Sequence, residues 1–264
     1  MRPDTITVHC LQLDYPAGEG AGTRLERILG ELRDAPAADL VVLPELWDVR
    51  YFDFDSYMEL ARPIADGPLP RVAEVAAKRG SVIAAGSILE RDGPYIFNTV
   101  GLLGEDGELL GRYRKMHLFP YGSREAELLT PGEAAAVIHT RLGRIGLATC
   151  FDLRFPEQFA EMRELGADLF VVPAAWPAGR VGDWEILIRA RAMENQLPLV
   201  GCNGVGDCAG VELGGSSLVV DGRGRPLAAA SKDPSSLSAV IDHEATARWR
   251  RDFPMRARPA ALPA

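Results

Sequence analysis

Short β-rich runs alternate with stretches of helical periodicity along most of the chain, and this alternation is the feature that most constrains the fold. Strands interleaved with helices are typical of α/β proteins, in which helices cover the faces of sheets. We predict helices at residues 22–34, 69–79, 156–165 and 184–195. The predicted strands are residues 5–13, 40–43, 81–89, 96–103, 108–112, 136–139, 144–148, 169–172, 199–202, 216–220 and 238–241.

One short pattern occurs twice. Residues 38–47, ADLVVLPELW, are echoed by residues 167–176, ADLFVVPAAW. We interpret the copies as similar half-units that face each other, consistent with two sheets packed between layers of helices, although strand composition alone could produce part of the likeness. Glu45 of the first copy aligns with Ala174 of the second. Only one strand end therefore carries a carboxylate, and the other is free to shape a pocket with Trp176 as a wall.

Composition indicates an ordinary globular protein. The 264 residues are 47% hydrophobic and 25% charged, which fits one large α/β domain or two small ones. Because no linker-like segment divides the chain, we expect a single domain over residues 1–264, with a C-terminal tail from about Trp249. The net charge of −8 disfavours a nucleic-acid partner.

Membrane and metal-binding classes are also disfavoured. No stretch approaches the roughly 18 uninterrupted apolar residues of a membrane helix, and the N-terminus lacks the pattern of a signal peptide. The four cysteines have neither Cys-x-x-Cys nor paired Cys/His spacing, so we expect no metal and no cofactor. A reactive thiol would favour a reducing, cytoplasmic location.

Cys150 is the cysteine that most needs an explanation. It ends the apolar run 144–149 at the point where the pattern turns helical, near Pro156. A thiol at such a junction lies near backbone N–H groups and the positive end of a helix dipole, and both favour the nucleophilic thiolate. The alternative is a small apolar core residue, since free cysteines are commonly buried.

Two charged residues also follow strand-like runs. Glu45 ends the run 40–43, and Lys115 follows the runs 96–103 and 108–112. Strand ends are where ligand sites gather in layered α/β folds. A carboxylate, an ammonium and the Cys150 thiol could act as base, oxyanion-binding cation and nucleophile. Taken singly, Glu45 and Lys115 would be ordinary surface charges.

The three motifs together resemble the nitrilase, or carbon–nitrogen hydrolase, superfamily. The resemblance rests on LPE at Glu45, RKMHLF at Lys115 and CFDLRFPE at Cys150, and it covers residues 5–255. It implies a four-layer α-β-β-α sandwich, in which two mixed sheets are flanked by helices. It also implies hydrolysis of a small-molecule amide through a cysteine thioester, with Lys115 and the backbone N–H of Phe151 holding the oxyanion.

The resemblance adds a second glutamate, which would fix Lys115 and steer the substrate. Glu125 fits this position, four residues before Leu129, whereas Glu127 reads as an exposed loop charge. We expect Asp152 and Arg154 to form a local ion pair that shapes the turn after the nucleophile.

The segment after the second echo bears on the substrate. Trp176-Pro-Ala-Gly-Arg180 is similar to a stretch of bacterial ω-amidases, which hydrolyse the terminal amide of 2-oxo acids such as 2-oxoglutaramate. Arg180 beside Trp176 could bind a substrate carboxylate with two hydrogen bonds, or it could be a solvated loop arginine. The alternatives are a deaminated-glutathione amidase, another aliphatic amidase, a nitrilase, a carbamoyl hydrolase, or a catalytically silent scaffold protein.

Related members pair through helices beside the nucleophile, so the resemblance also implies a homodimer. The corresponding helices here would be residues 155–165 and 184–195. Phe155, Phe159 and Met162 form one apolar stripe, and Ile186, Ala190 and Met193 form another. Both stripes could instead face the sheet of their own subunit.

Overall fold

Two six-stranded mixed sheets pack face to face in the computed structural model, which describes residues 2–255. The first has the order β14-β1-β2-β3-β4-β5 and the second β13-β12-β9-β8-β7-β6. The first sheet contains β1 (Thr5–Gln12), β2 (Leu40–Val42), β3 (Val82–Asp92), β4 (Tyr95–Leu103), β5 (Leu109–Arg114) and β14 (Ser235–Asp242). The second contains β6 (Ala136–Thr140), β7 (Gly143–Leu147), β8 (Leu169–Ala174), β9 (Leu199–Asn203), β12 (Leu218–Val220) and β13 (Pro226–Ala229).

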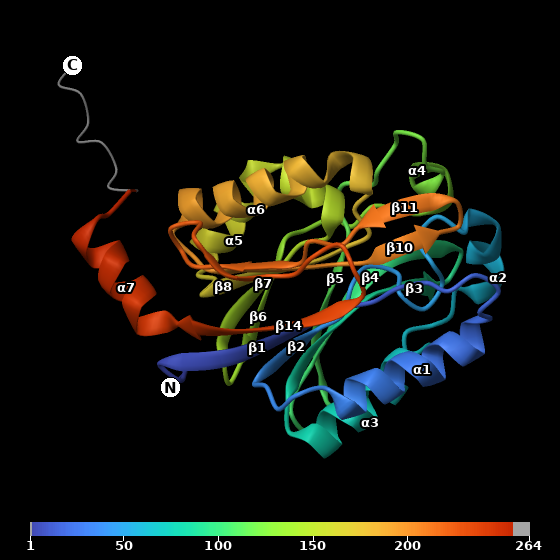
Figure 1. Ribbon diagram of the computed structural model, residues 1–264, viewed down its shortest axis with the longest axis horizontal. Coiled ribbons are helices and arrows are strands. Elements are labelled where there is room, and N and C mark those ends of the chain that lie inside the picture. The colour runs from blue at the N-terminus through green and yellow to red at the C-terminus, as the bar shows by residue number, and fades with distance from the viewer. Residues whose placement is uncertain (1, 256–264) are drawn as a thin grey trace.

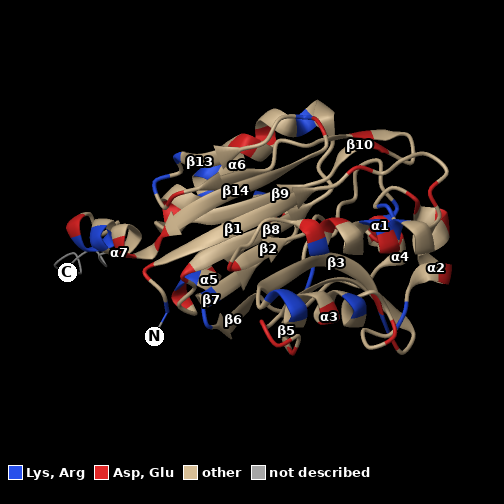
Figure 2. Ribbon diagram, turned by 60° about the horizontal axis from the view of Figure 1, so that its bottom comes forward, with Lys and Arg blue, Asp and Glu red and all other residues tan. Residues whose placement is uncertain are grey.

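Helices cover the outer face of each sheet (Figure 1). One layer holds α1 (Ala21–Asp34) and α3 (Leu69–Arg79), and the other holds α5 (Pro156–Glu164) and α6 (Val181–Asn195). The predicted α/β class and the four-layer α-β-β-α order are therefore confirmed. Charged residues occur mainly on the helices and connections, and the strands contain few of them (Figure 2).

The alternation of side chains along a strand explains how the first sheet contributes to an apolar core on each of its faces. In β1, Val8 and Cys10 face the second sheet, whereas Leu11 packs toward the helices. In β2, Leu40 and Val42 likewise join the layer between the sheets. Successive side chains of a strand point to opposite faces, so a strand covered on both sides must be apolar throughout.

The parallel strands place their carboxyl ends at one edge. In the first sheet β2 is parallel to β3, and in the second β7 is parallel to β8, which is parallel to β9. The two edges meet where the backbone N–H of Glu45 donates to the carbonyl of Ala174, at 3.3 Å. The echoed strands β2 and β8 thus end side by side, from opposite sheets.

Several elements differ from the prediction. Helix α6 begins at Val181, three residues earlier than the predicted 184. The hairpin β10 (Val205–Cys208) and β11 (Val211–Gly214), strand β13 and helix α7 (His243–Asp252) were not predicted. Shorter turns are α2 (Tyr57–Leu60), α4 (Glu125–Leu128) and the 3₁₀ segments Phe54–Ser56, Cys150–Arg154 and Ala178–Arg180.

Helix α7 corrects the position of the expected tail, because Trp249 lies inside it. Its first turn is capped by Asp242, whose carboxylate accepts the backbone N–H of Ala245 at 2.7 Å. Figure 1 shows α7 extending beyond the end of the sheets. Residues 256–264 of the predicted tail lie outside the described part of the chain. Within residues 2–255, no helix is both long enough and apolar enough to cross a membrane.

Candidate active site

The four predicted catalytic residues converge where the two sheets end. Glu45 follows β2, Lys115 follows β5, Cys150 follows β7, and Glu125 opens the short helix α4. The first two and Glu125 are fully buried, and Cys150 is 7% exposed. Charged side chains are almost never fully buried unless they are paired, so this cluster marks a site rather than a surface.

Lys115 lies between the two glutamates. Its Nζ is 2.8 Å from Oε1 of Glu45 and 3.0 Å from both carboxylate oxygens of Glu125. Burial alone would lower the pKa of Lys115, but Glu125 and Glu45 raise it well above its usual value. The ammonium therefore stays charged and holds the two carboxylates in place.

Glu45 is held on both of its oxygens. Oε1 accepts from Lys115 and from Nδ2 of Asn98, each at 2.8 Å, and Oε2 accepts the backbone N–H of Ala175 at 2.9 Å. Burial raises the pKa of Glu45, Lys115 lowers it, and Glu125 raises it again. The result is a carboxyl group whose pKa is above its ordinary value, as a general base near neutral pH requires.

A bulge in β3 positions the loop that carries Glu45. Gly86 has a φ of 61°, and a β-carbon added there would lie 2.0 Å from the carbonyl oxygen of Pro44. Beside it, the backbone N–H of Leu46 donates to Oγ of Ser87 at 3.1 Å, and Nε1 of Trp47 donates to the carbonyl of Ala85 at 2.7 Å. The close approach of two backbones fixes the strand end and requires glycine.

Glu125 is bound from three directions besides Lys115. Its carboxylate accepts from the hydroxyl of Tyr51 at 2.9 Å, the amide of Asn98 at 2.9 Å and the backbone N–H of Phe119 at 2.7 Å. These contacts tie α4 to the segment that follows Lys115. Glu127, by contrast, is a mostly exposed side chain, as expected.

Cys150 occupies a strained backbone position, with a φ of 49° at a non-glycine residue. Such conformations cost about 1–3 kcal/mol and cluster at functional sites. The turn is held by a reciprocal pair of hydrogen bonds between Thr149 and Asp152. Asp152 also accepts from the hydroxyl of Tyr113 at 2.6 Å and from His117, so His117 supports the turn.

The predicted ion pair between Asp152 and Arg154 is wrong. The Asp152 carboxylate is already saturated by its buried donors, and Arg154 instead pairs with Asp183 of α6 at 2.6 Å. The preference of Cys150 for thiolate is also corrected. Burial raises the pKa of the thiol well above its usual value, and Glu45 raises it further, against a lowering by Lys115. The resting group is a thiol that needs a base.

Cys150 opens into a narrow pocket of about 20 Å³, which is room for roughly one water molecule. The predicted Phe151, Trp176 and Arg180 all line it. The guanidinium of Arg180 lies 5.3 Å from the ring of Phe119. The remaining lining residues, which sequence reasoning missed, are Tyr51, Phe52, Phe119, Arg154, Ala175 and Pro177.

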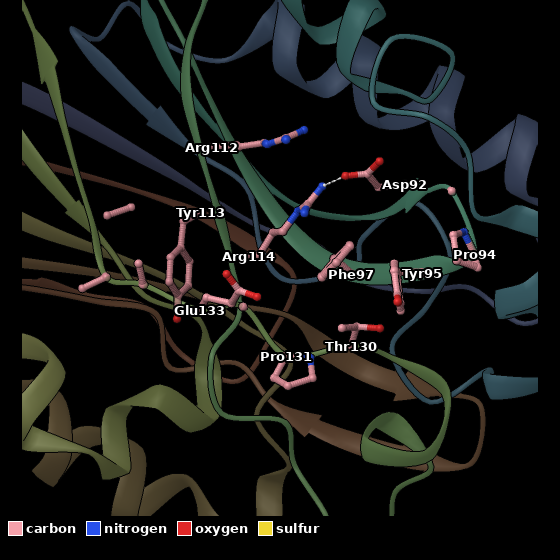
Figure 3. Close-up of a pocket in the computed structure, with 15 residues that line it drawn as sticks. Asp92, Pro94, Tyr95, Phe97, Arg112, Tyr113, Arg114, Thr130, Pro131 and Glu133 are labelled. Carbon is pink, nitrogen blue, oxygen red and sulfur yellow. Dashed lines mark hydrogen bonds and ion pairs between the residues drawn. The ribbon is translucent and has the colours of Figure 1, made fainter.

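A larger groove of about 880 Å³ lies elsewhere, between β4, β5 and the segment before β6 (Figure 3). None of the four clustered residues lines it. Its Arg114 is already paired with Asp92 and with Glu90, and it stacks on Phe97 at 3.7 Å. Because the groove holds no nucleophile, its size does not make it the reaction site. Among the described residues, no three His, Cys, Asp or Glu side chains are grouped to hold a metal.

A thiol beside a buried Glu–Lys–Glu cluster, at the joined ends of an α-β-β-α sandwich, defines a cysteine hydrolase of the nitrilase type. The sequence model of the carbon–nitrogen hydrolase family matches residues 18–251, and the chain belongs to this family. The predicted resemblance is thus confirmed, and the protein is a hydrolase of carbon–nitrogen bonds other than peptide bonds.

The chain is similar to the 2-oxoglutaramate amidase of Paenarthrobacter nicotinovorans, with 34% identity over 258 residues, which covers 95% of this chain and 88% of the relative. It is also 34% identical to a deaminated glutathione amidase of Yersinia enterocolitica over 242 residues, covering 86% and 83%. Among solved structures, Saccharomyces cerevisiae Nit3, a member of branch 10 of the nitrilase superfamily, superposes with a TM-score of 0.87 and 28% identity, covering 97% and 96%.

Proposed function

We propose that this protein is an ω-amidase, which releases ammonia from the terminal amide of a small 2-oxo acid such as 2-oxoglutaramate. One observation carries the proposal: the pocket above Cys150 is walled by aromatic rings and by the two guanidinium groups of Arg154 and Arg180. A chain of net charge −8 repels an anionic substrate unless local cations offset its field. Arg180 at the mouth of the pocket supplies that offset, together with Arg154, whose charge is shared with Asp183 of α6.

The acylation step uses the thiol and the clustered charges. As Sγ of Cys150 bonds to the amide carbon, its proton passes to Glu45 and the carbonyl electron pair moves to oxygen. Lys115 has three N–H donors. Glu45 engages one, and a second, shared between the two oxygens of Glu125 at 3.0 Å each, would leave the third for the oxyanion. With the backbone N–H of Phe151, this donor would stabilise the tetrahedral intermediate by about 2.7–4 kcal/mol per bond.

Product formation reverses the proton transfer. Glu45 returns its proton to the amide nitrogen as the C–N bond breaks, so ammonia leaves and a thioester remains on Cys150. A water molecule then gives a proton to Glu45 and attacks the thioester, which releases the acid and restores the thiol. Glu125 would hold Lys115 in position throughout, since it keeps contact with Nζ through both oxygens.

A deaminated-glutathione amidase is the second candidate. The similarity to the enzyme from Yersinia enterocolitica is as high in identity as that to the 2-oxoglutaramate amidase. Both substrates carry a carboxylate that arginine can bind and would form the same acyl thioester, but deaminated glutathione has a dipeptide as its leaving group, which must extend from the pocket. Because 2-oxoglutaramate places less of its structure beyond the narrow space beside Cys150, it is the first candidate.

Product release from a substrate panel tests the proposal, measured as ammonia for the primary amides and the nitrile and as cysteinylglycine for deaminated glutathione. The panel contains 2-oxoglutaramate, 2-oxosuccinamate, deaminated glutathione, a neutral aliphatic amide and a nitrile. We expect kcat/KM to be highest for 2-oxoglutaramate and Cys150→Ala to abolish turnover. Fast, stoichiometric alkylation of Cys150 by iodoacetamide, seen by mass spectrometry, would separate an enzyme from a silent scaffold.

Arginine variants then test carboxylate recognition. Arg180→Leu and Arg154→Leu should each raise KM for 2-oxoglutaramate about 10-fold or more, as loss of a charged hydrogen bond predicts. The neutral amide should be unaffected. Arg141→Leu, remote from the pocket, is the matched control for the change in net charge. Equal losses for charged and neutral amides would contradict the proposal.

We also propose a cytoplasmic homodimer. All four cysteines are free thiols, which supports a reducing compartment. Leu165, Ile186 and Met193, at the end of α5 and along α6, are 52%, 68% and 45% exposed. Large apolar side chains gathered on one helical layer support an interface there.

A further inference from the structure

Asn98 of β4 touches all three charged members of the cluster, although no sequence pattern singled it out. It is fully buried, and its Nδ2 donates to Oε1 of Glu45 at 2.8 Å and to Oε1 of Glu125 at 2.9 Å. Its backbone carbonyl accepts the N–H of Lys115 at 2.8 Å. One side chain therefore fixes the spacing of the two carboxylates, and its backbone anchors the lysine between them.

The orientation of the amide follows from its neighbours. If the group were turned over, its carbonyl oxygen would face two carboxylate oxygens and both hydrogen bonds would become repulsive. In the observed orientation the Oδ1 atom of Asn98 is buried without a hydrogen-bond partner among the described residues. A buried unpaired carbonyl is costly. The fold tolerates this cost because both N–H groups of the Asn98 amide are needed to hold the two carboxylates.

The hydrogen bonds to Glu45 leave one place for a proton. Each carboxylate oxygen has about two lone-pair sites. On Oε1, Lys115 and Asn98 occupy both sites. On Oε2, the backbone N–H of Ala175 occupies one. A single lone pair on Oε2 remains, and the neighbouring Cys150 thiol contributes a lowering of the pKa of Glu45.

We propose that Asn98 is a positioning residue that blocks Oε1 of Glu45 and thereby reserves Oε2 as the atom that exchanges protons with Cys150. The inference rests on the proposed roles of Glu45 and Cys150. The S–H proton moves to Oε2 as the C–S bond forms, and it moves from Oε2 to the leaving nitrogen as the C–N bond breaks. Asn98 itself neither gains nor loses a proton, since both of its N–H groups remain donors.

The acid limb of the pH profile provides the test. Glu45 must be ionised to accept the proton, so kcat/KM rises with pH through its pKa. Removing a hydrogen-bond donor destabilises the ionised form and raises that pKa. Asn98→Leu should therefore move the acid limb up by about one to two pH units and lower kcat/KM at pH 7 about 10- to 100-fold. The titratable groups around Glu45 are Lys115, Glu125, Cys150, Tyr15, Tyr51 and Tyr57.

Of these groups, the three tyrosines stay neutral because burial raises their pKa values, and burial likewise raises the pKa of the Cys150 thiol. Lys115 stays charged because Glu125 and Glu45 raise its pKa against the effect of burial. None of these groups titrates in the acid range, so we interpret a shift of the acid limb as a change in the ionisation of Glu45. Asn98→Asp, which keeps the shape and removes the donors, is the second variant if the leucine variant does not fold. It should shift the limb at least as far, because it adds a third carboxyl group.

Thr99→Val is the matched control. Thr99 is also fully buried on β4, and its hydroxyl donates to the Glu90 carboxylate at 2.7 Å, away from the cluster. This variant loses a comparable buried hydrogen bond, and the acid limb of its kcat/KM profile should stay at the wild-type pH. A fall in kcat/KM for the Asn98 variants with an unmoved limb would show a merely structural role and overturn the proposal.

A second readout separates this inference from the proposed function. The rate of Cys150 alkylation by iodoacetamide needs no amide substrate, and its acid limb also follows ionisation of the base. The Asn98 variants should shift that limb by the same amount. If wild-type protein hydrolysed no amide but the alkylation limb still shifted, the substrate would be wrong and the positioning role would stand. An unshifted alkylation limb in both Asn98 variants would refute the role directly.

Discussion

Lys115 is the residue on which the charge balance of the buried cluster depends. It is the positive charge that contacts Glu45 and Glu125 directly, within about 3 Å of each. Removing one partner of a buried ion pair costs about 3–5 kcal/mol, because the other charges stay buried without compensation. Here two carboxylates would remain, and loss of the Lys115 charge, which lowers the pKa of Glu45, would leave that pKa further above the unfolded value.

We therefore expect Lys115→Met to be least stable near neutral pH and to recover stability in acid. The folded state of the variant binds protons more tightly than the unfolded chain, so its free energy of unfolding increases as pH falls below the raised pKa of Glu45. Urea unfolding at pH 7.5 and pH 5 measures this, with exposed Lys78→Met of α3 as the control. If the variant's loss of unfolding free energy relative to wild type were as large at pH 5 as at pH 7.5, the ion-pair account would be wrong. Turnover should fall mainly in kcat.

At the scale of elements, we predict that a substitution in the β3 bulge displaces the loop that carries Glu45. Gly86→Ala places a β-carbon 2.0 Å from the Pro44 carbonyl oxygen, so the strand end that carries Glu45 must move. A displacement of about 1 Å can cost roughly 100-fold in rate. We expect a large loss of kcat together with a loss of stability of about 2 kcal/mol or more.

The control Gly80→Ala distinguishes backbone strain at a positive φ from displacement of the neighbouring loop. Gly80 ends α3 at a φ of 65°, close to the 61° of Gly86, but a β-carbon there meets nothing within 4 Å. This control should lose about 1 kcal/mol and keep its kcat. If both variants retained full turnover at a temperature where they are folded, the bulge would not be positioning the Glu45 loop.

The same elements show what sequence can and cannot predict. The run at 40–43 was recognisable because a strand covered on both faces is apolar throughout. The hairpin of β10 and β11 was missed because Gly206, Asp207 and Gly210 interrupt any alternation. Helix α7 was missed because it is rich in arginine and presents little apolar surface for periodicity to reveal.

Some residues of the site could likewise be predicted from the sequence, and others could not. Glu45, Lys115 and Cys150 could be predicted because each follows a strand-like run and carries a chemically unusual side chain. Asn98 and Tyr51 could not, since their roles arise from hydrogen bonds across elements that only the assembled fold defines. Arg154 was assigned to its neighbour Asp152. Buried donors already saturate that carboxylate, and Arg154 pairs with Asp183 of α6 at the wall of the pocket.

For the whole molecule, the apolar stripes on the second helix layer resolve into two sets. Phe159 and Met162 of α5 are fully buried against the sheet of their own subunit, as the alternative interpretation held. Ile186 and Met193 of α6 are exposed on the opposite side of the layer. The sequence period showed the apolar positions but not which of them the subunit covers itself, because that depends on helix rotation against the sheet.

From these exposed residues we predict a homodimer that forms through α6. A stable homodimer buries about 1,200–2,000 Å² in total, and exposed aliphatic side chains on α6 would lie at its apolar centre. We expect light scattering at micromolar concentration to give the mass of two 28.6 kDa chains. The double variant Ile186→Glu with Met193→Glu should dissociate, because charges would face each other in a desolvated interface. Met58→Glu, a comparably exposed apolar residue on α2, should leave the mass unchanged. A monomeric wild-type protein would contradict the dimer and leave the buried cluster of Glu45, Lys115 and Cys150 as it is, since every contact described within that cluster comes from one chain.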